Sequence, residues 1–218
     1  MDEAGRGPWA GPVVAAAVIL RARAGDPTTC AWPDFGVRID DSKRLSPLQR
    51  SRAYRVILRR AIVGVGICPA ERIDAINIFQ ATLEAMREAV DGLGTRPELV
   101  LVDGQHAPKI AVPCWTIVDG DHLSYTVACA SIVAKVLRDS LMTFYHRLFP
   151  SYDFHRHKGY GTSVHLAALS QWGPSMLHRM SFRPVWAQAQ REMDLSGVSK
   201  ESVDGAVASV VVGSPALS

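Results

Sequence analysis

Four apolar runs along the chain have the composition of buried strands. They are rich in valine, isoleucine and alanine, and turn-forming residues bound most of them. The predicted strands cover residues 13–20, 61–68, 99–102 and 110–118. The last of these is interrupted by Pro113, which removes a backbone donor, and the third is stopped by Asp103-Gly104.

Helical signals alternate with these runs. Ser46-Pro47 combines an N-cap residue with proline at the first helical position. Apolar residues at helical spacing precede Gly94, and Asp121 is expected to cap a long helix. An aromatic and basic loop is expected at 152–165. The predicted helices cover residues 47 to about 60, 78–93, 121 to about 148, 164–171 and a segment after Pro184.

This order of elements predicts an α/β or α+β fold with a mixed sheet. A length of 218 residues favours one large domain, which we place at residues 1–195. Residues 196–218 contain serine, valine, glycine and alanine without periodicity and predict a flexible tail. A composition of 48% hydrophobic and 21% charged residues argues against a disordered or fibrous chain.

Charge, cysteine usage and hydropathy bear on the compartment and the partners. The net charge of +3 is compatible with a phosphate-bearing partner but does not require one. The four cysteines show no C-x-x-C spacing, which favours free thiols in a reducing cytoplasm. The longest apolar run is too short to cross a membrane, and acids at positions 2 and 3 replace the basic start of a secretion signal. We therefore expect a cytoplasmic protein without membrane contact.

Four acids occupy positions where carboxylates of an open sheet can converge: Asp2, Glu3, Asp103 and Asp121. The first two precede a glycine-rich turn, the third ends an apolar run, and the fourth opens a predicted helix. Oxygen ligands of this kind suit Mg²⁺ or Mn²⁺, which support phosphodiester hydrolysis. Taken singly, each acid is more typical of a turn or a helix cap than of a metal ligand, so the prediction depends on the four acids together.

Three polar segments could contact a phosphate backbone. Gly5-Arg6-Gly7 offers backbone N–H groups and a forked cation, although most such triplets are plain turns. Asp41-Ser42-Lys43 is polar, and residues 155–160 place Tyr160 among cations, a mixture that can stack on a sugar or simply form a solvated loop. On the long predicted helix, positions 124, 128, 131 and 135 share a face of mostly small residues, which suits close packing or a substrate.

Taken together, these segments resemble bacterial ribonuclease HII, the type 2 ribonuclease H. The matching blocks occur in family order between residue 2 and about residue 190. They are DEAGRGPWAGPVVAAAVIL (2–20), DSKRLSP (41–47), ERIDAINIFQATLEAM (71–86), LVLVDG (99–104), GD (120–121), ASIVAKVLRD (130–139), HKGYGT (157–162) and HRMSF (178–182).

The resemblance implies a ribonuclease H-like fold, with a five-stranded mixed sheet flanked by helices and a helical C-terminal part. It also implies an endonuclease that hydrolyses the RNA-containing strand of RNA/DNA hybrids. Single ribonucleotides embedded in duplex DNA would be cut on their 5′ side, leaving 3′-hydroxyl and 5′-phosphate ends. The implied role is removal of misincorporated ribonucleotides and RNA primers, by a protein that we expect to be monomeric.

The resemblance also assigns residues. The family's four acids, which bind the catalytic Mg²⁺ or Mn²⁺, fall on Asp2, Glu3, Asp103 and Asp121. Its junction-sensing Gly-Arg-Gly falls on Gly5, Arg6 and Gly7, and its deoxyribose-packing tyrosine on Tyr160. The phosphate contact falls on Lys43, with Arg179 and Lys158 as less specific matches.

One departure from the family concerns the first strand. Family members carry several apolar residues before the Asp-Glu pair, whereas only Met1 precedes Asp2 here. A shortened strand would place two ligands on a frayed terminus, so a catalytically impaired hybrid-binding module is the main alternative. A different metal-dependent phosphotransferase finds no support, because the chain has neither a phosphate-binding Gly-x-x-x-x-Gly-Lys-[Ser/Thr] loop nor an Asp-x-Asp pair.

Overall fold

The computed structural model describes residues 1–20 and 35–196. Residues 21–34, and the predicted tail apart from Ser196, lie outside the described residues. The helices are α1 (Pro47–Arg60), α2 (Ala70–Asp91), α3 (Gly120–Leu123), α4 (Tyr125–Leu148), α5 (Phe154–His157), α6 (Ser163–Trp172) and α7 (Arg183–Ser196), with a 3₁₀ turn η1 (Pro150–Tyr152). The strands are β1 (Asp2–Ala4), β2 (Val13–Leu20), β3 (Ala61–Cys68), β4 (Val100–Asp103) and β5 (Cys114–Ile117).

The five strands fall into a three-stranded and a two-stranded group, which backbone hydrogen bonds of Met1 link side by side. Strands β1, β2 and β3 pair antiparallel in that order, and β4 pairs parallel with β5. The backbone of Met1 joins the two groups: its amine donates to the Leu101 carbonyl (2.5 Å), and its carbonyl accepts from the Asp103 N–H (3.0 Å). The resulting order is β3-β2-β1-β4-β5, which confirms the five-stranded ribonuclease H-like sheet.

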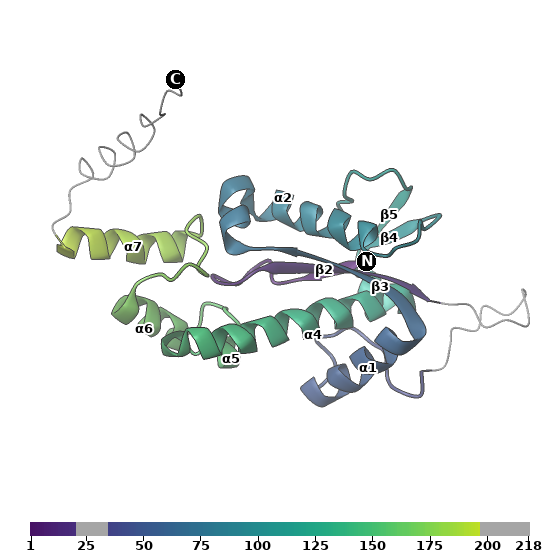
Figure 1. Ribbon diagram of the computed structural model, residues 1–218, viewed down its shortest axis with the longest axis horizontal. Helices are drawn as coiled ribbons and strands as arrows, with labels where there is room; N and C mark the ends of the chain where they lie inside the picture. Colours follow the sequence, from purple (N-terminus) through teal and green to yellow (C-terminus); the bar gives the residue numbers. More distant parts are fainter. Residues whose placement is uncertain (21–34, 197–218) are drawn as a thin grey trace, which may run out of the picture.

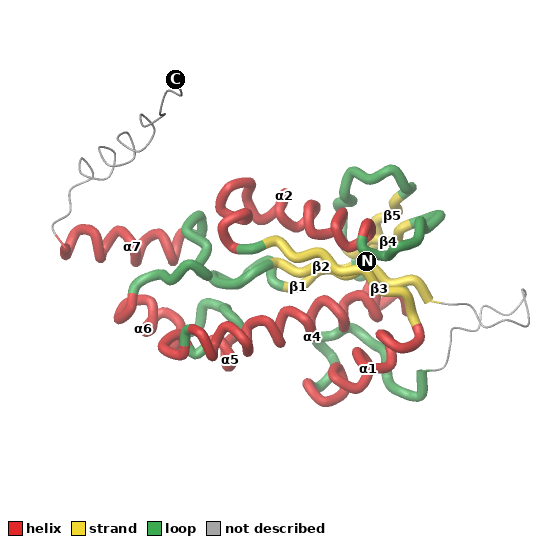
Figure 2. The backbone as a smooth tube through the Cα atoms, in the orientation of Figure 1, coloured by secondary structure: helices red, strands yellow, loops and turns green. Residues whose placement is uncertain are grey.

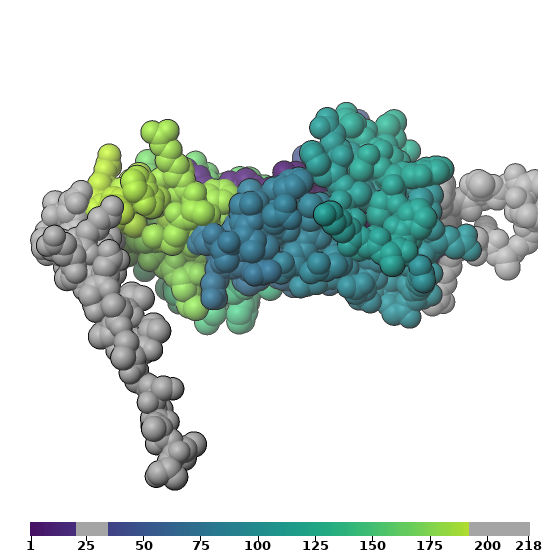
Figure 3. All heavy atoms as spheres, turned by 90° about the horizontal axis from the view of Figure 1, so that it is seen from above, coloured from purple at the N-terminus to yellow at the C-terminus, as the bar shows by residue number. Residues whose placement is uncertain are grey.

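Helices cover both faces of this sheet (Figures 1 and 2). Helix α2 packs on β2 and β3 from one side, while α4 packs on β1 and β2 from the other and α1 packs against α4. The alternation of β2 decides this arrangement: Val13, Ala15 and Ala17 face the α2 side, and Ala16 and Val18 face the α4 side. Seen from above, α2 lies between the C-terminal helices and the segment that carries β4 and β5 (Figure 3).

Several predicted boundaries agree with the structure. Strands β2 and β3 and helix α1 have the predicted bounds. The predicted cap forms, since Ser46 accepts from the Gln49 N–H and the Gln49 side chain accepts from the Ser46 N–H. The described cysteines, Cys68, Cys114 and Cys129, are free thiols. In the described part of the chain no helix is long and apolar enough to span a membrane.

Other boundaries were wrong. Asp121 does not cap the long helix: it lies inside the short α3, and an extended Ser124 (φ −126°) separates α3 from α4. Helix α2 begins earlier than predicted and is broken at Asn77, where φ is +68° and the amide oxygen accepts from the N–H groups of Phe79 and Gln80. The predicted strand at 110–118 shrinks to β5, after Pro113. The predicted loop at 152–165 contains α5.

Candidate active site

The sheet topology brings three of the four predicted acids together. Asp2 and Glu3 lie in β1, and Asp103 ends β4, the neighbouring strand. Asp121 joins them because the Asp103 Oδ1 atom accepts from the Gly120 N–H at 2.7 Å, which fixes α3 against the end of β4. A side chain at position 120 would press on that oxygen, since its Cβ would lie 3.2 Å away. Glycine therefore avoids a tight contact at this position.

The terminal position of these acids does not leave them frayed. Met1 is 3% exposed and holds β1 in the sheet through its bonds to β4. Strand β1 also pairs in register with β2, with Glu3 opposite Ala15. The expectation that a short first strand would leave Asp2 and Glu3 on a frayed end is therefore wrong for this structure.

The carboxylates of the site are buried or partly buried, and they repel one another. Asp2 is 5% exposed, and burial together with the charges of Glu3 and Asp103 raises its pKa to about 7. Burial also raises the pKa of Glu3, against the opposing effect of Arg6. The pKa of Asp121 is raised by burial and by the nearby Asp41 and Asp103. Burial is the largest cause of each shift, and repulsion by neighbouring carboxylates adds to it.

The donor set fits a hard divalent cation. It consists of carboxylate oxygens, which suit Mg²⁺ and Mn²⁺. The Glu3 Oε2 atom is buried and has no hydrogen-bond partner among the described residues, while Oε1 accepts from Arg6 at 3.3 Å. In the described part of the chain, no three of the four acids offer oxygens within 4.8 Å of one another.

Lys43 supplies a cation beside the acids. Burial lowers the pKa of its ammonium group, but the charges of Asp41, Asp121, Asp2 and Asp103 outweigh this effect and raise the pKa. Lys43 lies in a tight turn in which the Asp41 carboxylate accepts from its backbone N–H at 2.9 Å. The predicted contact residue therefore lies near enough to the four carboxylates to be affected by their charges.

The Gly5-Arg6-Gly7 turn follows β1 directly. Gly5 has a φ of +95°, and a Cβ there would lie 1.9 Å from the Arg138 side chain. The Arg179 guanidinium, which is fully buried, donates to the carbonyls of Gly5, Arg6 and Gly11. The backbone N–H groups of Arg6 and Gly7 donate to no described residue. The turn thus has its carbonyls held by the protein and two donors left for a ligand.

Tyr160 lies beside this turn. The residue is 45% exposed, and a Cβ on Gly7 would lie 3.9 Å from its ring. The Arg138 guanidinium stands 5.9 Å from the ring centroid and donates to the Lys158 carbonyl at 3.0 Å. The same arginine donates to the carbonyls of Ala10 and Pro12. Arg138 therefore ties the loop that carries Tyr160 to the segment that follows the glycine turn.

The family profile and the similar known proteins agree on one family. The family profile described as Ribonuclease HII matches residues 1–186. A ribonuclease HII from Syntrophus aciditrophicus is 50% identical over 184 residues, covering 84% of this chain and 82% of the relative. The chain belongs to the ribonuclease HII family. Its members are enzymes, and this chain is a ribonuclease H.

Solved structures agree with this ribonuclease HII fold. The ribonuclease H2 of Pyrococcus horikoshii OT3 superposes with a TM-score of 0.68 at 21% identity, covering 87% of this chain and 95% of that one. Bst-RNase HIII, solved in complex with Mn²⁺, superposes with a TM-score of 0.60 at 18% identity, covering 87% and 69%. At these identities the superpositions support the fold.

The structure of this ribonuclease HII adds residues that sequence reasoning missed. Asp41 is buried and faces Asp121, and the motif Asp41-Ser42-Lys43 was the available signal. Ser131 hydrogen-bonds Ser42 at 3.0 Å and also lowers the pKa of Asp2 through a hydrogen bond. Ser131 was assigned only to a face of small residues. No local pattern in the sequence marks its contact with the acids, because its partners come from β1 and the loop before α1.

A basic groove of this ribonuclease HII runs along α4. It has a volume of about 770 Å³ and is bordered by the start of α1 and by α5. Its cationic side chains are Arg50, Lys135, Arg147, Arg156 and Lys158. Asp139 also lies in the groove, where it accepts from Lys135 at 2.8 Å, so the excess charge of the groove remains positive.

Proposed function

We propose that this ribonuclease HII hydrolyses the RNA-containing strand of RNA/DNA hybrids and cuts on the 5′ side of single ribonucleotides in duplex DNA. The products would carry 3′-hydroxyl and 5′-phosphate ends, and Mg²⁺ or Mn²⁺ would be the cofactor. The observation that carries this proposal is the unpartnered, buried Glu3 carboxylate oxygen in a four-acid site next to the glycine turn. The site of hydrolysis would then lie next to the turn that recognises the ribose.

The carboxylates Asp2, Glu3, Asp103 and Asp121 would hold the cation. A divalent cation bound there would supply the Lewis acidity that phosphodiester hydrolysis requires at neutral pH. A divalent cation bound there would neutralise several carboxylates at once and would displace the proton that Asp2 holds near pH 7. The Lys43 ammonium would contact a phosphate of the cut strand, which places that strand over the acids.

The glycine turn would read the sugar. A 2′-hydroxyl both donates and accepts, so the open N–H groups of Arg6 and Gly7 can bind its oxygen, and a deoxyribose offers no such acceptor. The exposed Tyr160 ring would pack against the sugar that follows the ribonucleotide. Cations of the α4 groove would bind the phosphate backbone beyond the site.

We infer the compartment and the oligomeric state of the enzyme from its cysteines and its size. We propose a monomer that acts in the cytoplasm, where the free thiols Cys68, Cys114 and Cys129 would stay reduced. The burial-raised pKa values of the three thiols fit inert structural cysteines. Light scattering of the free enzyme and of its duplex complex would test the monomer.

The test is cleavage of an end-labelled DNA duplex with one embedded ribonucleotide. With Mg²⁺ or Mn²⁺ we expect one cut on the 5′ side of the ribonucleotide and a product end that a polymerase can extend. An RNA/DNA hybrid should be cut at many positions, and an all-DNA duplex of the same sequence should stay intact.

A binding assay distinguishes the proposed nuclease from the main alternative. A hybrid-binding module would bind the ribonucleotide-containing duplex more tightly than the all-DNA duplex, yet cut neither with any divalent cation. Cleavage on the 3′ side, or equal cleavage of the all-DNA control, would contradict the proposed specificity.

A further inference from the structure

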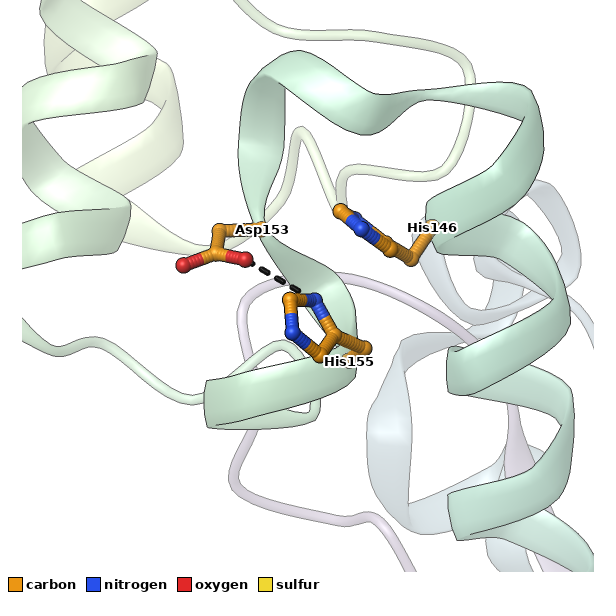
Figure 4. Close-up of side chains that lie close together, drawn as sticks. All are labelled: His146, Asp153 and His155. Carbon is orange, nitrogen blue, oxygen red and sulfur yellow. Dashed lines mark ion pairs between the residues drawn. The ribbon is translucent and has the colours of Figure 1, made fainter.

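A second group of metal-ligating side chains lies at the far end of α4 from the acids (Figure 4). His146 comes from the last turn of α4, Asp153 follows η1, and His155 lies in α5. One ligand atom from each residue lies within 4.8 Å of the others. Among the described residues this is the one group of three or more such side chains that meets this spacing.

The contacts within the group leave one ligand atom unused. His155 Nδ1 lies 2.8 Å from Asp153 Oδ1, and the two imidazole rings are 4.0 Å apart at their centroids. The His146 Nδ1 atom is buried and has no hydrogen-bond partner among the described residues. Ring packing accounts for the proximity of the two histidines, but it leaves this buried nitrogen without a hydrogen-bond partner, which is unfavourable unless a ligand occupies it.

The carboxylate is also directed into the group. Asp153 precedes α5 and stands at its cap position, yet its side chain makes no capping hydrogen bond. Instead it faces His155 on one oxygen and Arg156 on the other, at 2.8 and 3.4 Å. Figure 4 shows the His146 ring projecting toward His155 from the neighbouring helix.

We propose that His146, Asp153 and His155 form a binding site for a borderline divalent metal ion of the Zn²⁺ type. Two imidazoles and one carboxylate are a common three-ligand set for Zn²⁺, with solvent in the fourth position. Ligand atoms around such an ion lie roughly 3.4 Å apart, given bonds of about 2.1 Å. Because His155 is exposed, rotation of its side chain can close the group and leaves an entry path.

The site is chemically separate from the acids. Oxygen ligands at the sheet edge favour Mg²⁺ and Mn²⁺, whereas nitrogen ligands favour later transition metals. A metal ion bound by the three side chains would join the end of α4 to α5. Helix α5 leads directly into Lys158, so the ion would stabilise the segment that carries Tyr160.

The test is Zn²⁺ titration of the metal-free protein by calorimetry, with excess Mg²⁺ present to fill the carboxylate site. We expect saturable binding of one Zn²⁺ per chain and a rise of the unfolding midpoint with Zn²⁺. His155→Ala, His146→Ala and Asp153→Asn should each weaken binding about tenfold or more, since even outer partners of metal ligands cost 10–100-fold. His155 is exposed, so His155→Ala tests the site without disturbing the core.

The matched control is Arg156→Gln. This neighbouring side chain is exposed and contacts the same carboxylate, but it is not a metal ligand. Zn²⁺ binding should persist in Arg156→Gln. Co²⁺ titration should also give a visible absorption band that His155→Ala removes. Unsaturable Zn²⁺ binding, or binding that His155→Ala and His146→Ala leave unchanged, would overturn the proposal.

Discussion

Two polar clusters of the molecule differ in how their buried groups are paired: the carboxylate site, and the guanidinium network formed by Arg138 and Arg179 beside the glycine turn. The guanidinium groups have protein acceptors, whereas the carboxylates lack enough protein donors. Arg179 and Arg138 are almost completely buried, and they donate to backbone carbonyls of the segment from Gly5 to Pro12 and of Lys158. The acids instead repel one another, and one oxygen of Glu3 has no partner.

This difference separates stability from function. A buried group whose donors all find acceptors fixes a backbone conformation, here that of the turn. A buried group with unsatisfied charge costs stability and persists where a ligand neutralises it. Both orphan side-chain atoms among the described residues, on Glu3 and on His146, belong to the two groups that we assign to metal ions.

The largest expected effect is on cleavage. Asp103→Asn should lower the cleavage rate by a factor of about 10³ or more, because loss of one ligand charge weakens several kcal/mol of transition-state stabilisation. The fold should persist, since an amide oxygen can still accept from Gly120. Single-turnover cleavage of the ribonucleotide duplex measures this. Asp91→Asn on the exposed side of α2 is the control, and a loss below tenfold in Asp103→Asn would refute the assignment.

The guanidinium network should show the opposite behaviour. Arg179→Met should lower the free energy of unfolding by about 3–5 kcal/mol, because it leaves the carbonyls of Gly5 and Gly11 without their buried donor. Urea denaturation followed by circular dichroism measures the change. Arg183→Met, at an exposed position, should stay within about 0.5 kcal/mol. Equal midpoints for the two variants would show that the network is not structural.

Low pH should lower the free energy of unfolding through the buried histidine pair His165 and His178. Burial lowers the pKa of His165 to about 4 and of His178 to about 3, and the two rings share a 2.9 Å contact. Below the unfolded value near 6.5 the unfolded chain binds protons that the folded chain excludes. Stability is therefore lost as pH falls from about 6.5 toward 4. Between pH 7 and pH 5 each of the two histidines should lower the free energy of unfolding by about 2 kcal/mol, measured by urea denaturation.

A variant isolates this effect of pH from that of the acids. The raised pKa of Asp2 acts in the reverse direction, since the folded protein holds that proton up to about pH 7 and gains stability as pH falls. His178→Gln should therefore lose less stability between pH 7 and pH 5 than the unchanged protein. The same pH dependence in both would exclude the histidine pair as its source.

The smallest effect concerns Mg²⁺ and stability. Mg²⁺ at ten times its dissociation constant should raise the free energy of unfolding by about 1.4 kcal/mol through mass action. Glu3→Gln should lose most of this gain, because it removes a ligand charge, whereas His146→Ala should keep it. Thermal denaturation with and without Mg²⁺ measures both. A gain that His146→Ala abolishes would mean that the two metal groups are not independent.

The elements that local sequence predicted well are those with strong local signals. The Ser46-Pro47 cap and the long apolar run of β2 act over a few neighbouring residues, and their bounds agree with the structure. The break at Asn77 and the extended Ser124 carry no such signal. They depend on how α2 and α4 pack on the sheet. Apolar periodicity alone therefore predicted α2 too short and predicted α3 and α4 as one helix.

The sequence by itself determined the family and the order of elements, and it predicted the four acids as metal ligands, because motifs and apolar patterns are local properties of the chain. Only the tertiary structure decided which polar atoms are satisfied. Contacts such as Arg179 with Gly5, Ser131 with Ser42, and His146 with His155 join residues from different elements. Burial of those atoms, and therefore the free energy of leaving one unpaired, is set by packing, which no spacing along the chain records.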